Sequence, residues 1–65
     1  MPNTLKDRRT AKNLTQKELA ERAGVTLKAL QAYEQGYRPL GGASAEVVLK
    51  IAKALDTTVE ELLTE

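Results

Sequence analysis

The side chains best suited to chemistry in this 65-residue chain are hydrogen-bond donors rather than catalysts. The sequence contains no His and no Cys, which excludes imidazole acid–base catalysis, thiolate nucleophiles and the usual zinc sites. Glu60 and Glu61 are neighbours and point about 100° apart on a helix, so they do not converge on one substrate. Gly41-Gly42 lacks the Gly-Lys-Ser/Thr that ends a phosphate loop. We therefore expect no enzyme, no metal site and no cofactor. The remaining candidates are amides and cations: Gln16, Lys17, Lys28, Gln31 and Arg38.

Charge is unevenly distributed along the sequence. Residues 1–38 hold eight basic and four acidic side chains, a net charge of +4, whereas residues 39–65 hold two basic and five acidic ones, a net charge of −3. A positive half can face a polyanion while the negative half faces away or meets a partner. Two ordinary solvated surfaces explain the same asymmetry equally well, so charge alone does not identify the partner.

Length and composition predict one domain, residues 1–65, with an aliphatic core. Hydrophobic residues make up 42% of the chain, and Tyr33 and Tyr37 are its only aromatic residues. Without Cys, disulfides cannot reinforce so small a fold. No apolar run approaches the roughly 20 residues of a membrane span, and the N-terminus lacks the apolar stretch of a signal peptide. We expect no membrane partner and a cytoplasmic location.

Start signals and apolar spacing predict five short helices. Thr15 and Thr58 each precede a Glu by three positions, which is the capping-box pattern. Thr26 and Ser44 are simple N-cap residues, and Thr4 marks a further start. These starts place helices near 5–13, 16–23, 27–35, 45–55 and 59–64. No segment alternates with period two, so the predicted fold class is all-α.

The segment from Thr15 to Gly36 has the spacing of a helix-turn-helix. A capped helix of about two turns ends at Gly24, and a second helix begins at Leu27 after a short turn. A turn this short sets the two helices at a steep angle. With Leu30 facing the core, steps of about 100° per residue define the opposite face. That face carries Lys28, Gln31, Ala32 and Gln35.

Four stretches and Leu30 carry a resemblance to a known family: residues 14–26, 33–36, 49–55 and 59–63. Their order and spacing resemble those of the Cro and phage-repressor type of helix-turn-helix proteins, also called the xenobiotic-response-element (XRE) family. The resemblance implies a compact five-helix lambda-repressor-like DNA-binding domain whose helix-turn-helix consists of helices 2 and 3. It implies a small, nucleoid-associated transcriptional regulator, usually a repressor, with helix 3 in the major groove. The implied partners are double-stranded DNA with a two-fold symmetric operator, and a second copy of the chain in a homodimer.

The resemblance also implies roles for individual residues. Gln16 matches a Gln at the start of helix 2 that binds a phosphate. Base reading falls at four positions: Leu27, Lys28, Gln31 and Ala32. Of these side chains, only those of Lys28 and Gln31 are able to hydrogen-bond to a base. Few direct contacts to bases are therefore expected, and the shape of the DNA site contributes to specificity. Arg9 and Glu34 match a buried ion pair that ties helix 1 to the end of helix 3.

Two departures from the family pattern involve arginines. The loop after helix 3 is longer and less basic than usual, and Arg38 is the expected phosphate contact in it, with Tyr37 as a hydroxyl donor. Lys17 is a further expected phosphate contact at the start of helix 2.

Arg8 stands where an aliphatic residue is common in the family. Either its stem lies along the core, or the helix packs loosely there, or its head donates to a phosphate.

The competing hypothesis keeps the fold and changes the partner. In it, the chain is a protein-binding module, such as an antitoxin or adaptor, that uses the apolar helix 27–32 or the acidic C-terminal helix. Salt-dependent binding to duplex DNA distinguishes the two hypotheses. For a homodimer, Leu40, Leu62 and Leu63 are candidate contacts, although Leu62 and Leu63 have the spacing of core residues as well. No small-molecule effector site is evident.

Overall fold

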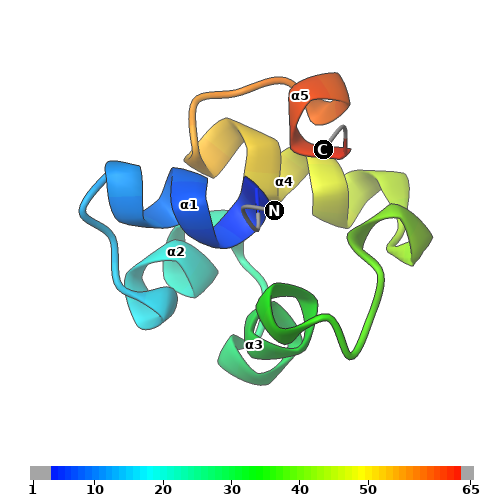
Figure 1. The fold of residues 1–65 in the computed structure, drawn as a ribbon, viewed down its shortest axis with the longest axis horizontal. Coiled ribbons are helices and arrows are strands. Elements are labelled where there is room, and N and C mark those ends of the chain that lie inside the picture. The colour runs from blue at the N-terminus through cyan, green and yellow to red at the C-terminus, as the bar shows by residue number, and fades with distance from the viewer. Residues whose placement is uncertain (1–3, 64–65) are drawn as a thin grey trace.

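The computed structural model describes residues 4–63, which fold into five α-helices joined by short loops (Figure 1). In chain order the helices are α1 (Thr4–Ala11), α2 (Gln16–Ala23), α3 (Leu27–Gln35), α4 (Ala45–Ala54) and α5 (Val59–Leu63). A short 3-10 helix, η1 (Leu40–Gly42), lies between α3 and α4. No strand occurs within residues 4–63. The predicted all-α class and five-helix arrangement are confirmed.

The helices begin at side chains that accept the free N–H groups of a first turn. Before α2, Thr15 Oγ1 accepts the Glu18 N–H at 3.0 Å and Thr15 N donates to Glu18 Oε1 at 2.9 Å, a complete capping box. Three other caps accept the N–H three positions on: Thr26 from Ala29, Ser44 from Val47 and Thr58 from Glu61. The side chain of Thr4, the predicted first cap, lies outside the described residues. Local capping therefore explains most of the helix starts.

Four of the helices end in one common motif. After each last turn, one residue has a left-handed backbone: Asn13 (φ 57°), Gly24 (φ 69°), Gly36 (φ 82°) and Asp56 (φ 56°). The next residue then donates its N–H back across the turn, as Val25 does to the Ala20 carbonyl at 3.0 Å. Gly adopts this backbone without strain, and Asn and Asp tolerate it.

These stops correct two predicted helix ends. The first helix ends at Ala11 and the fourth at Ala54, whereas their predicted ends are residues 13 and 55. In α1 the reason is that Asn13 takes the left-handed backbone, and in α4 it is that Leu55 (φ −97°, ψ 2°) already departs from helical geometry before the left-handed Asp56. The bounds of α2 and α3 are as predicted, and the predicted end of the last helix, residue 64, lies outside the described part of the chain.

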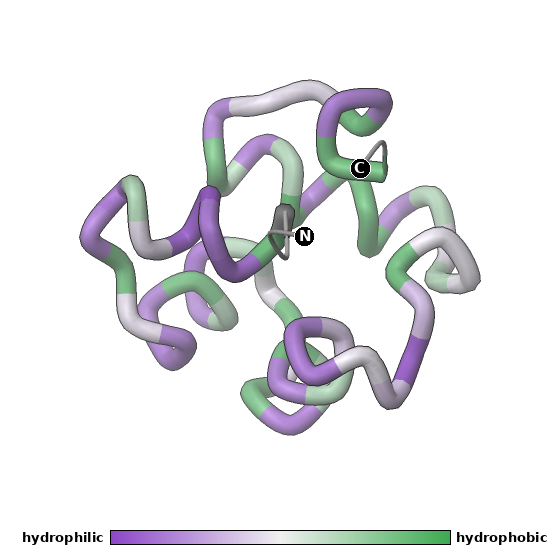
Figure 2. The backbone as a smooth tube through the Cα atoms, in the orientation of Figure 1, coloured by the Kyte–Doolittle hydropathy of each residue, from purple (hydrophilic) through white to green (hydrophobic). Residues whose placement is uncertain are grey.

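All five helices contribute to one aliphatic core. Its largest fully buried side chains are Leu19, Leu30 and Ile51, from α2, α3 and α4. The other buried apolar residues are Leu5, Leu14, Ala20, Ala23, Val48, Ala52, Leu55 and Leu62. Figure 2 shows apolar residues recurring along the helices, as burial of one face requires. Because α2 packs on both α3 and α4, and α1 contacts both α3 and α5, α3 is held with one face outward.

Candidate nucleic-acid interface

The turn between α2 and α3 determines how the second helix lies on the first. Gly24 ends α2, and Thr26 begins α3 by accepting the Ala29 N–H at 3.1 Å. Val25, between them, is half-buried against the core. Ala20 is buried with 3% of its surface exposed, and its small side chain permits the close approach of α3. The two helices and their turn form a helix-turn-helix whose second helix faces solvent on one side.

The residues predicted to read bases lie on the outer face of α3. Leu30 and Glu34 are buried on the inner face of this helix. Outward lie Leu27 and Lys28, which are exposed, and Gln31 and Ala32, which are half-buried. These four positions span about 140° of the helix circumference, so one groove can accommodate them. The structure brings the four together on one side and leaves two of them, Leu27 and Lys28, exposed.

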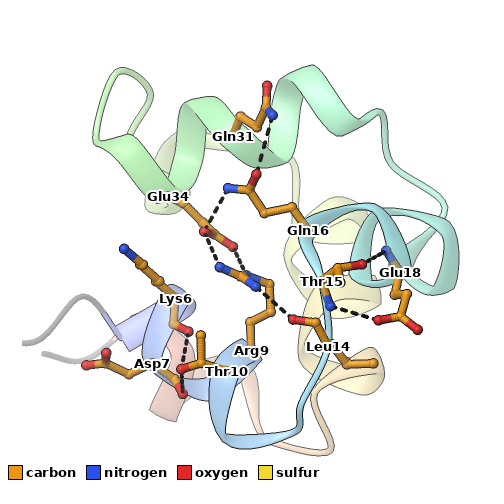
Figure 3. A network of polar contacts seen from close by, with 10 residues as sticks. All are labelled: Lys6, Asp7, Arg9, Thr10, Leu14, Thr15, Gln16, Glu18, Gln31 and Glu34. Carbon is orange, nitrogen blue, oxygen red and sulfur yellow. Dashed lines mark hydrogen bonds and ion pairs between the residues drawn. The ribbon is translucent and has the colours of Figure 1, made fainter.

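Arg9 connects α1, the loop after it and α3. Its Nε donates to Glu34 Oε2 at 2.6 Å and its Nη2 to Glu34 Oε1 at 3.3 Å (Figure 3). Its Nη1 donates to the Leu14 carbonyl at 2.7 Å. The side chains of Arg9 and Glu34 are only 11% and 2% exposed. The structure therefore places the predicted pair as a buried, bidentate contact, which is the stronger geometry for an Arg and a carboxylate.

The same carboxylate also contacts Gln16, the predicted phosphate ligand at the start of α2. Gln16 Nε2 donates to Glu34 Oε1 at 3.0 Å, and Gln16 Oε1 accepts from Gln31 Nε2 at 3.3 Å (Figure 3). One amide hydrogen of Gln16 thus remains for an outside acceptor. The connection between Gln16, Gln31 and Glu34 was not predicted from the sequence. Gln31 and Glu34, three positions apart and therefore neighbours on α3, were the available signal.

The first turn of α2 presents N–H groups to solvent. The capping box uses the backbone N–H groups of Thr15 and Glu18. As the first two helical residues, Gln16 and Lys17 have no intrahelical acceptor for theirs. The Thr15 N–H, followed by the Thr15 hydroxyl, lowers the pKa of Glu18 below its usual value. With the exposed Lys17 side chain, the free N–H groups make this turn suited to an anion.

The loop after α3 places Arg38 beside the outer face of that helix. The N–H groups of Tyr37 and Arg38 both donate to the Ala32 carbonyl, at 3.0 and 3.3 Å. A surface hollow of about 290 Å³ is lined by Thr26, Lys28, Ala29, Ala32 and Arg38. A second hollow, of about 310 Å³, is lined by Tyr33, Arg38, Pro39, Gly42 and Ala43. Both predicted loop contacts are exposed, Tyr37 to 80%, and Arg38 shares one hollow with Lys28.

Arg8 lies at the contact of α1 with α5. Its Nε is buried and has no hydrogen-bond partner within residues 4–63. The pKa of Glu61 on α5 is lowered, first by the Thr57 hydroxyl at 3.2 Å, then by the hydroxyl and N–H of Thr58, and least by the charge of Arg8. Figure 1 shows α5 and α3 at opposite ends of the molecule. Arg8 therefore packs toward α5, away from the outer face of α3.

Residues 4–63 contain neither a metal-binding cluster nor a membrane-spanning helix. No group of three or more His, Cys, Asp or Glu side chains there is placed to hold a metal ion. None of the helices in this range has the length and hydrophobicity that crossing a bilayer demands.

Comparison with protein-family models gives a match over nearly the whole chain. A model described as helix-turn-helix, of the Cro/phage-repressor (XRE) type, matches residues 5–62, from α1 to α5. Comparison with curated proteins gives no match, and comparison with solved structures gives none either. The family resemblance inferred from the sequence motifs is confirmed by the family model.

Proposed function

Because the chain belongs to the helix-turn-helix family of the Cro/phage-repressor (XRE) type, we propose that it binds double-stranded DNA sequence-specifically as a small transcriptional regulator. The outer face of α3 is the observation that carries this proposal. It presents Lys28 and Gln31, with Arg38 at its border, on a helix whose inner face is fixed in the core. A helix about 10–12 Å across fits a major groove about 12 Å wide. In our proposal Lys28 and Gln31 meet base edges, and Leu27 and Ala32 meet thymine methyl groups.

The proposed phosphate contacts come from two segments beside α3. At the start of α2, Gln16 and Lys17 offer their backbone N–H groups, an amide hydrogen and an ammonium group. After α3, Tyr37 and Arg38 offer a hydroxyl and a guanidinium group from exposed positions. Contacts of this kind fix the register of a protein on DNA, whereas base contacts give the sequence preference. Supported from both segments, α3 would be held in one orientation in the groove.

We also propose that residues 1–65 act as one domain, in a homodimer that represses by occupying a two-fold symmetric operator at the nucleoid. Leu62 is removed from the candidate dimer contacts because it is 3% exposed and belongs to the core. Leu40 is half-buried against that core. Leu63 and, in addition, Leu49 on α4 are 42% and 45% exposed and are apolar side chains that a partner copy could contact. Sedimentation across protein concentrations, with and without operator DNA, tests the dimer, and a monomer throughout contradicts it.

A protein-binding module is the second candidate function. The observation in its favour is Leu27, an apolar side chain 40% exposed at the start of α3, with the half-buried Ala32 five positions further on. An antitoxin or adaptor would cover this apolar part of α3 with a protein surface.

Selection of duplexes from a random pool tests the main proposal. We expect the selected duplexes to share a sequence, and their log affinity to fall with log salt by about 0.9 for each phosphate contacted. Lys28→Ala should change the preferred sequence, whereas Arg38→Ala should weaken all sites alike. Lys53→Ala, at an exposed position of α4, is the charge-matched control and should leave binding near the wild-type level. Absence of binding to any duplex at about 50 mM salt, with a stable protein complex instead, supports the second candidate and contradicts the first.

A further inference from the structure

Resting on the proposed DNA-binding function, we infer that the buried carboxylate of Glu34 fixes the orientation of the Gln31 amide through Gln16, and thereby determines which base Gln31 selects. Glu34 and Gln16 are positioning residues in this scheme, and Gln31 is the specificity-determining residue. The chain of contacts runs from Arg9 through Glu34 and Gln16 to the outer face of α3 (Figure 3).

The orientation of both amides follows from what each atom can donate or accept. The Glu34 carboxylate, paired with Arg9, only accepts hydrogen bonds. The Gln16 atom 3.0 Å from Glu34 Oε1 is therefore its NH₂ group, and the Gln16 oxygen faces the other way. That oxygen also only accepts, so the Gln31 atom 3.3 Å from it is the Gln31 NH₂ group. One assignment satisfies both contacts, and it originates at Glu34.

The opposite orientations are unfavourable because each brings two acceptors together. Turning the Gln31 amide would place its carbonyl oxygen against the Gln16 oxygen. Turning the Gln16 amide would place that oxygen against the Glu34 carboxylate, whose side chain is 2% exposed and has little access to replacement water. An unpaired acceptor at a buried site loses its hydration without compensation. The carboxylate therefore holds both amides in one state before any ligand arrives.

This state determines what Gln31 offers to a groove. Its NH₂ group uses one hydrogen on Gln16, which leaves the carbonyl oxygen and one amide hydrogen free. Figure 3 shows the Gln31 oxygen on the side away from Gln16. In the major groove adenine offers the N6 donor and the N7 acceptor, which match both free groups. Guanine offers two acceptors and thymine one, so they leave the Gln31 oxygen unpaired. We therefore expect adenine at the step that faces Gln31.

The first test uses the free protein and does not depend on DNA. The side-chain NH₂ signals of Gln31 are followed by NMR in the wild type and in Gln16→Met, which keeps the length of the side chain but removes its acceptor. We expect the Gln31 signals to move to the positions of a solvent-exposed amide, with faster hydrogen exchange. Gln35, exposed on the same helix, is the control and should not change. Unchanged Gln31 signals in Gln16→Met would overturn the inference.

The second test measures base preference on selected duplexes that carry adenine or guanine at the step facing Gln31. A bidentate contact discriminates by roughly 5- to 150-fold, and we expect wild type to fall in this range. In Gln16→Met the preference should fall to within about twofold at this step and stay unchanged at the step assigned to Lys28. Gln31→Met should lose the same preference, and adding Gln16→Met to it should change the preference no further.

The outcomes of the second test separate the inference from the proposed function. Uniform weakening by Gln16→Met, with every base preference retained, means that Gln16 only contacts a phosphate and overturns the inference. If the wild type binds no duplex, the proposed function is overturned, and the selection of a base by Gln31 is overturned with it. This outcome does not depend on the NMR result for the two amides. A circular dichroism spectrum of each variant confirms that its helices are intact.

Discussion

Helix α1 meets its two neighbours through adjacent arginines, and the two contacts differ in how completely the polar groups are paired. Arg9 donates three hydrogen bonds, two to Glu34 on α3 and one to the Leu14 carbonyl. Arg8, beside α5, keeps a buried Nε without a hydrogen-bond partner in the described part of the chain. One position along a helix is a rotation of about 100°, so neighbours of the same type enter different surroundings. The fuller pairing occurs where α1 supports α3, the helix that must be positioned.

Removing the carboxylate of Glu34, the partner of Arg9, should have the largest effect on stability. Glu34→Leu leaves Arg9 buried without its partner, and we expect the free energy of unfolding to fall by about 3–5 kcal/mol. Urea denaturation followed by circular dichroism measures this loss. The control is Glu46→Leu, which breaks an exposed contact with Lys50 at 3.7 Å and should cost less than about 1 kcal/mol. Equal losses in the two variants would remove the distinction between the contact at Arg9 and a surface ion pair.

Replacing both partners at once should recover most of that stability. Arg9→Met with Glu34→Leu leaves neither member of this pair without the other, and apolar side chains of similar volume often substitute for a buried pair at little cost. Recovery should be incomplete because Gln16 and the Leu14 carbonyl each lose a partner. Because the two single losses together exceed the loss in the double variant, the double-mutant cycle should give an interaction energy of about 3 kcal/mol or more. Additive losses would show that the two side chains act independently.

Replacing the arginine at the contact of α1 with α5 should increase the stability of the fold instead of decreasing it. Arg8→Met removes a buried nitrogen that lacks a partner among residues 4–63, and we expect stability to increase by about 1 kcal/mol or less. Differential scanning calorimetry should then show a rise in Tm of at most about 8 °C. Arg22→Met, at an exposed position of α2, makes the same charge change and should shift Tm little. A clear fall in Tm for Arg8→Met would mean that its contact resembles that of Arg9.

The smallest expected effect is on the dependence of stability on pH, through the carboxyl group of Glu61. The pKa of Glu61 lies below its usual value of 4.5, so its contacts stabilise the fold above that pH, and this contribution is lost as pH falls through the lowered pKa. Because the Thr57 hydroxyl is the largest cause and Arg8 the smallest, Thr57→Val should raise the pKa of Glu61 more than Arg8→Met does. NMR titration of the carboxyl carbon from about pH 6 to about pH 2 measures both shifts. A larger shift in Arg8→Met would assign an ion pair to this contact.

Much of the helical architecture could be predicted because its signals are local. The capping box at Thr15 and the Gly24 turn lie within a few residues of the helices they bound, and α2 and α3 have the predicted bounds. The end of α1 was predicted two residues too late because Asn13 adopts a left-handed backbone, which few residues other than Gly adopt, and the end of α4 was one residue too late because Leu55 departs from helical geometry.

The candidate site was predictable in its outline and not in its contacts. Helical periodicity places Lys28 and Gln31 on the outer face of α3, because that face depends only on position in the helix. The contacts of Gln16 depend on how closely α2 lies on α3, which no local pattern specifies. Apolar spacing likewise did not separate Leu62, which is in the core, from Leu63, which is 42% exposed.

The sequence separation of the Arg9–Glu34 pair has a consequence for the order of folding. The two residues are 25 positions apart, whereas caps and helix stops close within five. Helices form in about 0.1–1 μs, and contacts that close a longer loop follow because loop closure costs more entropy. We expect α2 and α3 to form early and α1 to dock on them late. Transient undocking of α1 from the folded domain would then release the orientation of α3 while leaving α2, α3 and α4 folded. Native-state hydrogen exchange would detect this as α1 amides that exchange faster than those of α4.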